Sequence, residues 1–272
     1  MFVNKLSNTI KVPYNMVKGS VIQRQAQANQ MTDNLYKLFE KDIKDNYALF
    51  QFSDIIKKIF EIIPKNLSVF IKPNRNAKYG AYTENLYNHG RKAVGVAIYL
   101  PEISKSVRTA HLPLLMHEFQ HVTDQICHPK YASRAQSLNR KKLLNKKYER
   151  LYDKYFYCIE DCRTEKAKNE TLENVKIRTM NFLKKHSIRE QLDFIQDTRY
   201  TLESEIAAYK KENEFAQKLK DNNLQFFKES LINVPERSLF AEKIQILKEI
   251  GFELIKNERK AHAQRLNATV SN

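Results

Sequence analysis

Hydrophobic residues recur every three or four positions along most of this chain, which is the spacing of amphipathic helices. Ahead of residue 65 the spacing predicts one helix from about Val21 to Phe50 and a second, with Ser53 as its N-cap, that ends before Pro64. Beyond residue 130 it predicts charged amphipathic helices over four segments: Tyr131–Arg163, Leu172–Lys185, Ile188–Phe227 and Glu236–Asn257. From Glu258 onward the chain is basic and polar, and we expect a frayed tail.

Two segments before residue 101 have the pattern of strands instead. The first is Leu67–Lys72, closed by Pro73, and a polar loop through Gly90 follows it. In the second, Lys92–Leu100, apolar side chains alternate between two faces, and Pro101 ends the segment. A further helix is expected from about Ser104 to Ile126, with Pro113 either as a kink or in the first turn of a restarted helix.

These elements predict an α+β fold that is mostly α. The chain has only 5 Gly and 7 Pro and shows no Gly/Ser linker or internal repeat. We therefore expect a single domain over residues 1–272, with a strand-containing half at about 1–130 and a helical half at about 131–260. Residues 261–272 are expected to form a flexible tail.

The composition of the chain indicates which kinds of binding partner and which location to expect. The 47 Lys and Arg against 31 Asp and Glu give a net charge of +16, which favours acidic partners but is also typical of a Lys-rich solvated surface. No dense basic run or nucleic-acid motif is present, so a protein or peptide, acidic or not, is expected rather than a nucleic acid. No signal peptide and no run of ~18 apolar residues is visible. These features indicate no membrane span, and a location in the cytoplasm or export without a cleaved signal peptide, including into a host cell.

The cysteines add little. Cys127, Cys158 and Cys162 are too few for a disulfide framework. Cys158 and Cys162 are four residues apart on a predicted helix, but no second pair accompanies them, so packing is expected rather than metal binding.

Residues 117–121 have the sequence His-Glu-Phe-Gln-His, which is the strongest chemical signal in the chain. On a helix, His117 and His121 lie on one face and can reach one metal ion, and Glu118 is then placed beside the water that the ion would activate. Catalytic zinc takes three protein ligands and keeps a position for water. The sequence therefore has to supply a third ligand.

The third ligand is expected on a later helix. The extended motif HExxHxxGxxH is excluded, because Asp124 and Cys127 occupy its last two positions. Glu203 and Glu205 are the candidates, and Glu205 lies within the apolar stripe of its helix whereas Glu203 does not. A carboxylate on an apolar face is costly unless it is paired or binds a metal, so Glu205 is the predicted ligand and Glu203 the fallback. A buried salt bridge at Glu205 is the alternative.

Other side chains are candidates for supporting roles. Asp124 is expected either to orient a ligand histidine or to be a solvated residue at the helix end. The strand Ala93–Leu100 is expected to offer an edge to an extended peptide, with small residues at Ala93, Gly95 and Ala97 as the substrate-binding positions. Donors to a developing oxyanion are sought among these residues: Tyr209, Tyr200, Arg199, His111 and His128.

The motif His117-Glu118-x-x-His121 together with Glu205 in Glu-Ile-Ala-Ala-Tyr resembles the gluzincins, zinc metallopeptidases with HExxH on one helix and a glutamate on a later one. The resemblance covers about 120 residues and includes the order of strand and motif helix. It implies a zincin-like fold, one Zn²⁺ per chain bound by His117, His121 and Glu205, and peptide-bond hydrolysis with Glu118 as general base. A compact peptidase without a visible signal peptide resembles intracellular peptidases and host-directed bacterial effector proteases.

Three other functions are alternatives to a zinc peptidase. Peptide deformylases also contain HExxH, but they need a cysteine ligand before the motif, and this chain has none there. A basic helical binding protein for nucleic acid or an acidic protein would leave two histidines buried at high cost. A zinc-bound but inactive zincin fold used as an interaction module is disfavoured by the presence of Glu118.

Overall fold

The computed structural model describes residues 20–45, 49–63, 68–74, 81–87, 93–101, 105–127, 146, 171–222 and 234–270. Two compact units are present, residues 1–136 with 207–232 and residues 137–206 with 233–272. The predicted helix Tyr131–Arg163 lies outside the described residues except for Lys146, which is helical. Cys158, Cys162 and His128 also lie outside them. The single-domain expectation stays a prediction.

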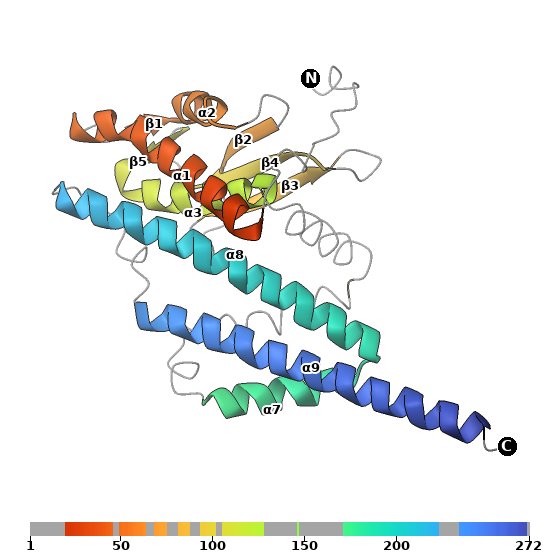
Figure 1. Cartoon of the computed structure of the whole chain (residues 1–272). Helices are drawn as coiled ribbons and strands as arrows, with labels where there is room; N and C mark the ends of the chain where they lie inside the picture. Colours follow the sequence, from red (N-terminus) through yellow and green to blue (C-terminus); the bar gives the residue numbers. More distant parts are fainter. Residues whose placement is uncertain are drawn as a thin grey trace. The chain divides into compact units, whose positions relative to one another are not determined.

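A three-stranded sheet is the centre of the first unit (Figure 1). Its order is β2 (Ser68–Pro73), β4 (Ala93–Leu100), β3 (Tyr82–Tyr87), with β2 parallel and β3 antiparallel to β4. A second, two-stranded sheet pairs β1 (Leu49–Gln51) with β5 (Ser106–Arg108) in antiparallel register. Both predicted strands are therefore confirmed, whereas β3 forms within the segment that was expected to be a loop.

The expected edge position of strand Ala93–Leu100 is wrong. It is β4, the central strand, and its backbone is paired on both sides. Ala93, Gly95 and Ala97 therefore cannot add a peptide strand, and within the described residues the edge strands of this sheet are β2 and β3. The small residue at position 95 has a different cause: a Cβ built on Gly95 would lie 2.6 Å from the backbone oxygen of Ser68 on β2.

Helices cover this sheet. The helix α1 (Val21–Lys44) contacts α3 (Leu112–Cys127), and α2 (Phe52–Phe60) contacts β2. The expected N-cap of α2 is wrong, because Gln51 occupies that position and Ser53 is the second helical residue. The expected start of the motif helix near Ser104 is also wrong, because strand β5 and a 3₁₀ turn, Thr109–His111, come before α3. Pro113 is the second residue of α3, where its missing N–H costs nothing.

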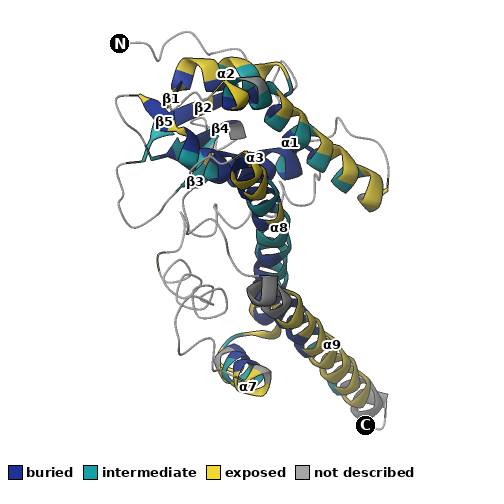
Figure 2. Cartoon of the chain, turned by 90° about the vertical axis from the view of Figure 1, so that its left-hand side faces the viewer, coloured by how far each residue is buried: buried dark blue, intermediate teal, exposed yellow. Residues whose placement is uncertain are grey.

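The core of the first unit lies between these helices and one face of the sheet. Alternate residues of β4, namely Val96, Ile98 and Leu100, are buried there together with apolar residues of α1, α2 and α3. Almost every residue of α3 is buried, and Figure 2 shows this helix largely in the colour of buried residues. The helix that carries the HExxH motif is therefore held on several sides.

The second unit is helical where the structure describes it. It contains α7 (Leu172–Leu183), α9 (Val234–Val270) and the N-terminal part of α8 (Ile188–Asp221), and α7 packs on α9. The helix α9 continues well past Asn257, so the expected end there is wrong. Residues 252–264 of this helix are mostly exposed (Figure 2). None of the described helices is long and apolar enough to cross a membrane.

The fold class is thus confirmed as α+β and mostly α.

Candidate metal centre

The two histidines of the motif face one another on α3. Their Nε2 atoms are 3.2 Å apart, and the rings are nearly perpendicular, with an angle of 76° between their planes. Two nitrogen ligands of a tetrahedral zinc ion, each about 2.05 Å from it, would be about 3.3 Å apart. The separation of His117 and His121 therefore suits a shared zinc ion without any change in backbone.

A carboxylate completes a group of three. The ligand atoms of His117, His121 and Glu205 all lie within 4.8 Å of one another. Glu205 is carried by α8, a continuous helix from Ile188 to Asp221 that the division between the units cuts after Ile206. The carboxylate oxygen would have to approach by up to roughly 1.5 Å for zinc geometry, which the flexible glutamate side chain can provide. The N, N, O donor set matches that of catalytic zinc in peptidases.

The fallback ligand Glu203 has another partner. Its Oε1 lies 3.5 Å from a guanidinium nitrogen of Arg199, one turn earlier on α8, and both side chains are about one-third exposed. The structure thus groups Glu205 with the histidines and pairs Glu203 with Arg199. Both glutamates are partly buried, and the choice of Glu205 as the metal ligand stays a prediction.

Two further residues of α8 contact His117. The ring of Tyr209 packs edge-on against it, with ring centroids 4.5 Å apart. The Nδ1 atom of His117 lies 2.8 Å from Oε2 of Glu212, a residue only 3% exposed. Glu205, Tyr209 and Glu212 follow i, i+4 and i+7, so they form one stripe along α8. Tyr209 was expected near the site, whereas Glu212 was not among the predicted site residues.

Glu118 is held by the edge strand β3. The hydroxyl of Thr83 donates to Oε2 of Glu118 at 2.6 Å and approaches its backbone oxygen at 3.3 Å. Thr83 is opposite Ile98 in the β3–β4 ladder, so it lies on the inner face of the sheet. The carboxylate is only 6% exposed. This contact fixes the orientation of the residue expected to act as general base.

Asp124 differs from both expectations. It is 2% exposed rather than solvated, and its Oδ1 accepts hydrogen bonds from Gln120 at 2.8 Å and Gln25 at 3.2 Å, not from a ligand histidine. Gln25 belongs to α1, so Asp124 faces the α1–α3 contact. Burial raises the pKa of Asp124 to about 7, although both hydrogen bonds act in the opposite direction. Among these buried carboxylates, Glu212 rather than Asp124 is the one in hydrogen-bond contact with a motif histidine.

The remaining predicted donors are not gathered at the cluster. Tyr200 precedes Tyr209 by nine residues, or two and a half turns, so it faces the opposite side of α8. Arg199 pairs with Glu203. His111 ends the 3₁₀ turn before α3, and burial together with the charge of Arg108 lowers its pKa. Tyr209, by contrast, makes a ring contact with the motif residue His117.

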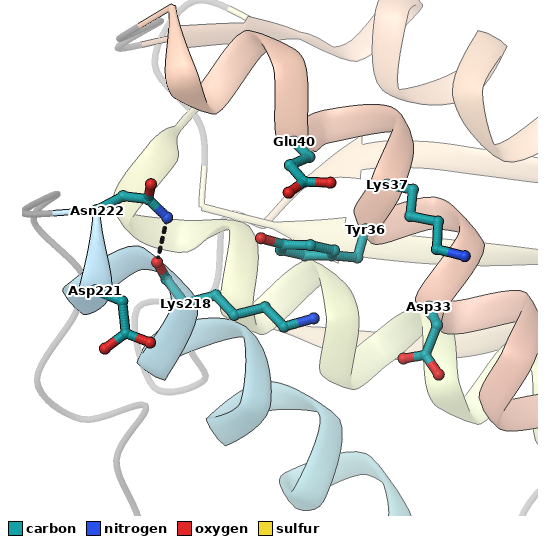
Figure 3. A pocket seen from close by; sticks show the side chains of 7 residues that line it. All are labelled: Asp33, Tyr36, Lys37, Glu40, Lys218, Asp221 and Asn222. Carbon is teal, nitrogen blue, oxygen red and sulfur yellow. Dashed lines mark hydrogen bonds between the residues drawn. The ribbon is translucent and has the colours of Figure 1, made fainter.

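A pocket of about 340 Å³ lies elsewhere in the first unit. Figure 3 shows it between α1 and the C-terminal end of α8, with Lys218 extended along the ring of Tyr36. The Nζ atom of Lys218 is 3.8 Å from the centroid of that ring. The other lining residues are charged or polar: Asp33, Lys37, Glu40, Asp221 and Asn222. The pocket contains none of the residues of the histidine cluster.

No protein-family model, curated protein or solved structure matches this chain.

Proposed function

We propose that this protein is a zinc-dependent endopeptidase with a zincin-like fold. The observation that carries the proposal is the grouping of His117, His121 and Glu205, with the two Nε2 atoms 3.2 Å apart. A zinc ion held by these three residues would polarise a peptide carbonyl and lower the pKa of a water molecule towards ~7.

In this proposal Glu118 is the residue that accepts and later donates the proton. It follows His117 directly on α3 and is not one of the three grouped residues. Its carboxylate accepts the proton of the attacking water and then donates it to the leaving amine. The hydroxyl of Thr83 binds Oε2 and thereby restricts the rotation of the carboxylate. A base held in one orientation loses less entropy in the transition state.

The edge strand β3 suits a peptide substrate. It is antiparallel to β4, and its other edge is not paired with a strand in the described sheet. An extended peptide can add to such an edge through backbone hydrogen bonds, and β3 also carries the threonine that binds Glu118. This role replaces the one predicted for Ala93, Gly95 and Ala97 on β4. It also favours cleavage within extended segments of a protein substrate.

The test separates metal binding from catalysis. Full-length protein purified without chelator is expected to contain about one zinc per chain by mass spectrometry, and His117→Ala is expected to lose it. Glu118→Gln is expected to keep the zinc and lose hydrolysis of peptides in a proteome-derived library. Wild-type protein that binds no zinc would refute the peptidase proposal, and a fully active Glu118→Gln variant would refute the role of Glu118.

A further inference from the structure

Helix α8 buries a carboxylate, that of Glu212, which is not one of the three proposed metal ligands. Glu212 is 3% exposed, and within the described residues the hydrogen-bond partner of its side chain is His117. Burying a carboxylate is unfavourable unless its oxygens find hydrogen-bond donors. Neighbouring acidic residues of α8 have cationic partners instead: Glu214 lies 3.0 Å from Nζ of Lys211. A lysine or arginine partner would also have served at position 212.

The contact with Glu212 is the basis for placing the hydrogen of His117. Where the carboxylate is ionised it only accepts, so Nδ1–H of His117 is then the donor across the 2.8 Å to Oε2 of Glu212. The neutral ring then has its lone pair on Nε2, the atom that is 3.2 Å from Nε2 of His121. The ring is also fixed from the side by Tyr209. Both contacts come from α8, the helix that carries Glu205.

We propose that Glu212 is a positioning residue that holds His117 in the Nδ1–H tautomer, with Nε2 directed at the metal position. The inference rests on the proposed function, since it assigns a purpose to Glu212 at the same site. Glu212 also ties α8 to α3 seven residues after Glu205, so the hydrogen bond that prepares one ligand helps to place another. Carboxylate partners of this kind typically change metal affinity by ten- to a hundredfold when removed.

The first measurement needs no variant. Ring ¹⁵N chemical shifts of His117 in chelator-treated wild-type protein report directly which nitrogen carries the hydrogen. We expect the Nδ1–H tautomer. Glu212→Gln keeps an acceptor and is expected to keep this tautomer, whereas Glu212→Ala is expected to lose it. Finding the Nε2–H tautomer in the wild type would overturn the inference, whatever the variants do.

The second measurement is zinc affinity, determined by competition with a chelator of known affinity. Glu212→Ala is expected to bind zinc about ten- to a hundredfold more weakly than wild type, with Glu212→Gln between the two. The matched control is Glu214→Ala, two residues later on the same helix, which is expected to bind like wild type. Equal affinity of Glu212→Ala and Glu214→Ala would contradict the inference, as would equal affinity of Glu212→Gln and Glu212→Ala.

Failure of the proposed function gives a different result. In that case wild-type protein binds no zinc. The ring ¹⁵N shifts of His117 still show whether Glu212 holds the ring in the Nδ1–H tautomer.

Discussion

At the scale of single residues, three carboxylates are buried around α3, and each accepts hydrogen bonds from a different kind of donor. Glu118 accepts from the hydroxyl of Thr83, Glu212 from the ring of His117, and Asp124 from two glutamine amides. Each pairing lowers the cost of removing a charge from water. Of these carboxylates, Asp124 has a pKa that burial raises to about 7.

Replacing Asp124 with Asn should change how stability depends on pH. The unfolded chain releases this proton near pH 4, whereas the folded chain keeps it up to about pH 7. The folded state therefore binds more protons in this window, and stability falls as the pH rises through it. Asn cannot ionise, so Asp124→Asn should become more stable relative to wild type between pH 4 and pH 8, by a few kcal/mol at most. Urea unfolding at pH 4, 6 and 8 measures the difference.

The control for this prediction is Asp54→Asn, since Asp54 is half exposed on α2 and pairs with Lys57. Its stability should follow that of wild type across the same range. A constant difference between Asp124→Asn and wild type would show that the Asp124 carboxyl has an ordinary pKa.

A pair of glutamates two residues apart on α8 tests the third ligand. Glu205→Gln should weaken zinc binding by more than the ten- to hundredfold typical of residues that only support a ligand. Glu203→Gln removes a partly exposed ion pair with Arg199, which contributes at most about 1 kcal/mol to stability, and should leave zinc affinity unchanged. Chelator competition measures both. The reverse order of affinities would assign the ligand to Glu203.

The residues of this cluster differ in how far sequence alone could predict them. The spacing within the motif predicts that His117 and His121 share a helix face, and the apolar stripe of α8 favours Glu205 over Glu203. Glu212 could not be selected in the same way, because a glutamate at i+7 is common on a charged helix. The contact of Glu212 with His117 depends on which face of α8 packs against α3, and the tertiary structure determines that face.

At the scale of elements, alternation predicts that a strand forms but not where it lies in a sheet. The clean alternation of Ala93–Leu100 gives β4 correctly, yet a central strand with one small-residue face has the same pattern as an edge strand. The strand β3 is not evident from the sequence because it contains the polar residues Thr83, Glu84 and Asn85 and lacks an alternation of apolar and polar positions. Its pairing with β4 supplies the stability that its own sequence does not indicate.

The close approach of β2 to β4 gives a prediction at this scale. Gly95→Ala would place a Cβ 2.6 Å from the backbone oxygen of Ser68, so one strand has to shift. We expect a loss of about 1–3 kcal/mol in the free energy of unfolding, measured with urea. Gly251→Ala in α9 is the matched control. Its Cβ would make an ordinary contact with Ile195 at 3.7 Å, and alanine favours a helix by up to about 1 kcal/mol over glycine.

At the scale of the whole molecule, α8 belongs to both units. Its C-terminal half is tied to the first unit by Lys211, whose Nζ is 2.6 Å from Oδ1 of Asp33 on α1, and by the edge-on contact of Phe215 with Tyr36. The boundary after Ile206 coincides with no change in composition, so the sequence gives no sign of it. Helical spacing predicts that α8 and α9 exist, but it does not predict which unit each half joins.

Zinc binding should stabilise the whole folded chain, because the proposed ligands are brought together only when α3 and α8 are both in place. Binding to the folded state alone adds about 2.7 kcal/mol when free zinc is a hundred times the dissociation constant. For a chain of this size that corresponds to a rise in Tm of roughly 5–10 °C. Differential scanning fluorimetry with zinc and with chelator measures the shift. Glu118→Gln should show the same shift as wild type, since Glu118 is not a ligand, whereas His121→Ala should show almost none. An equal shift in His121→Ala would mean that zinc stabilises the protein from another site.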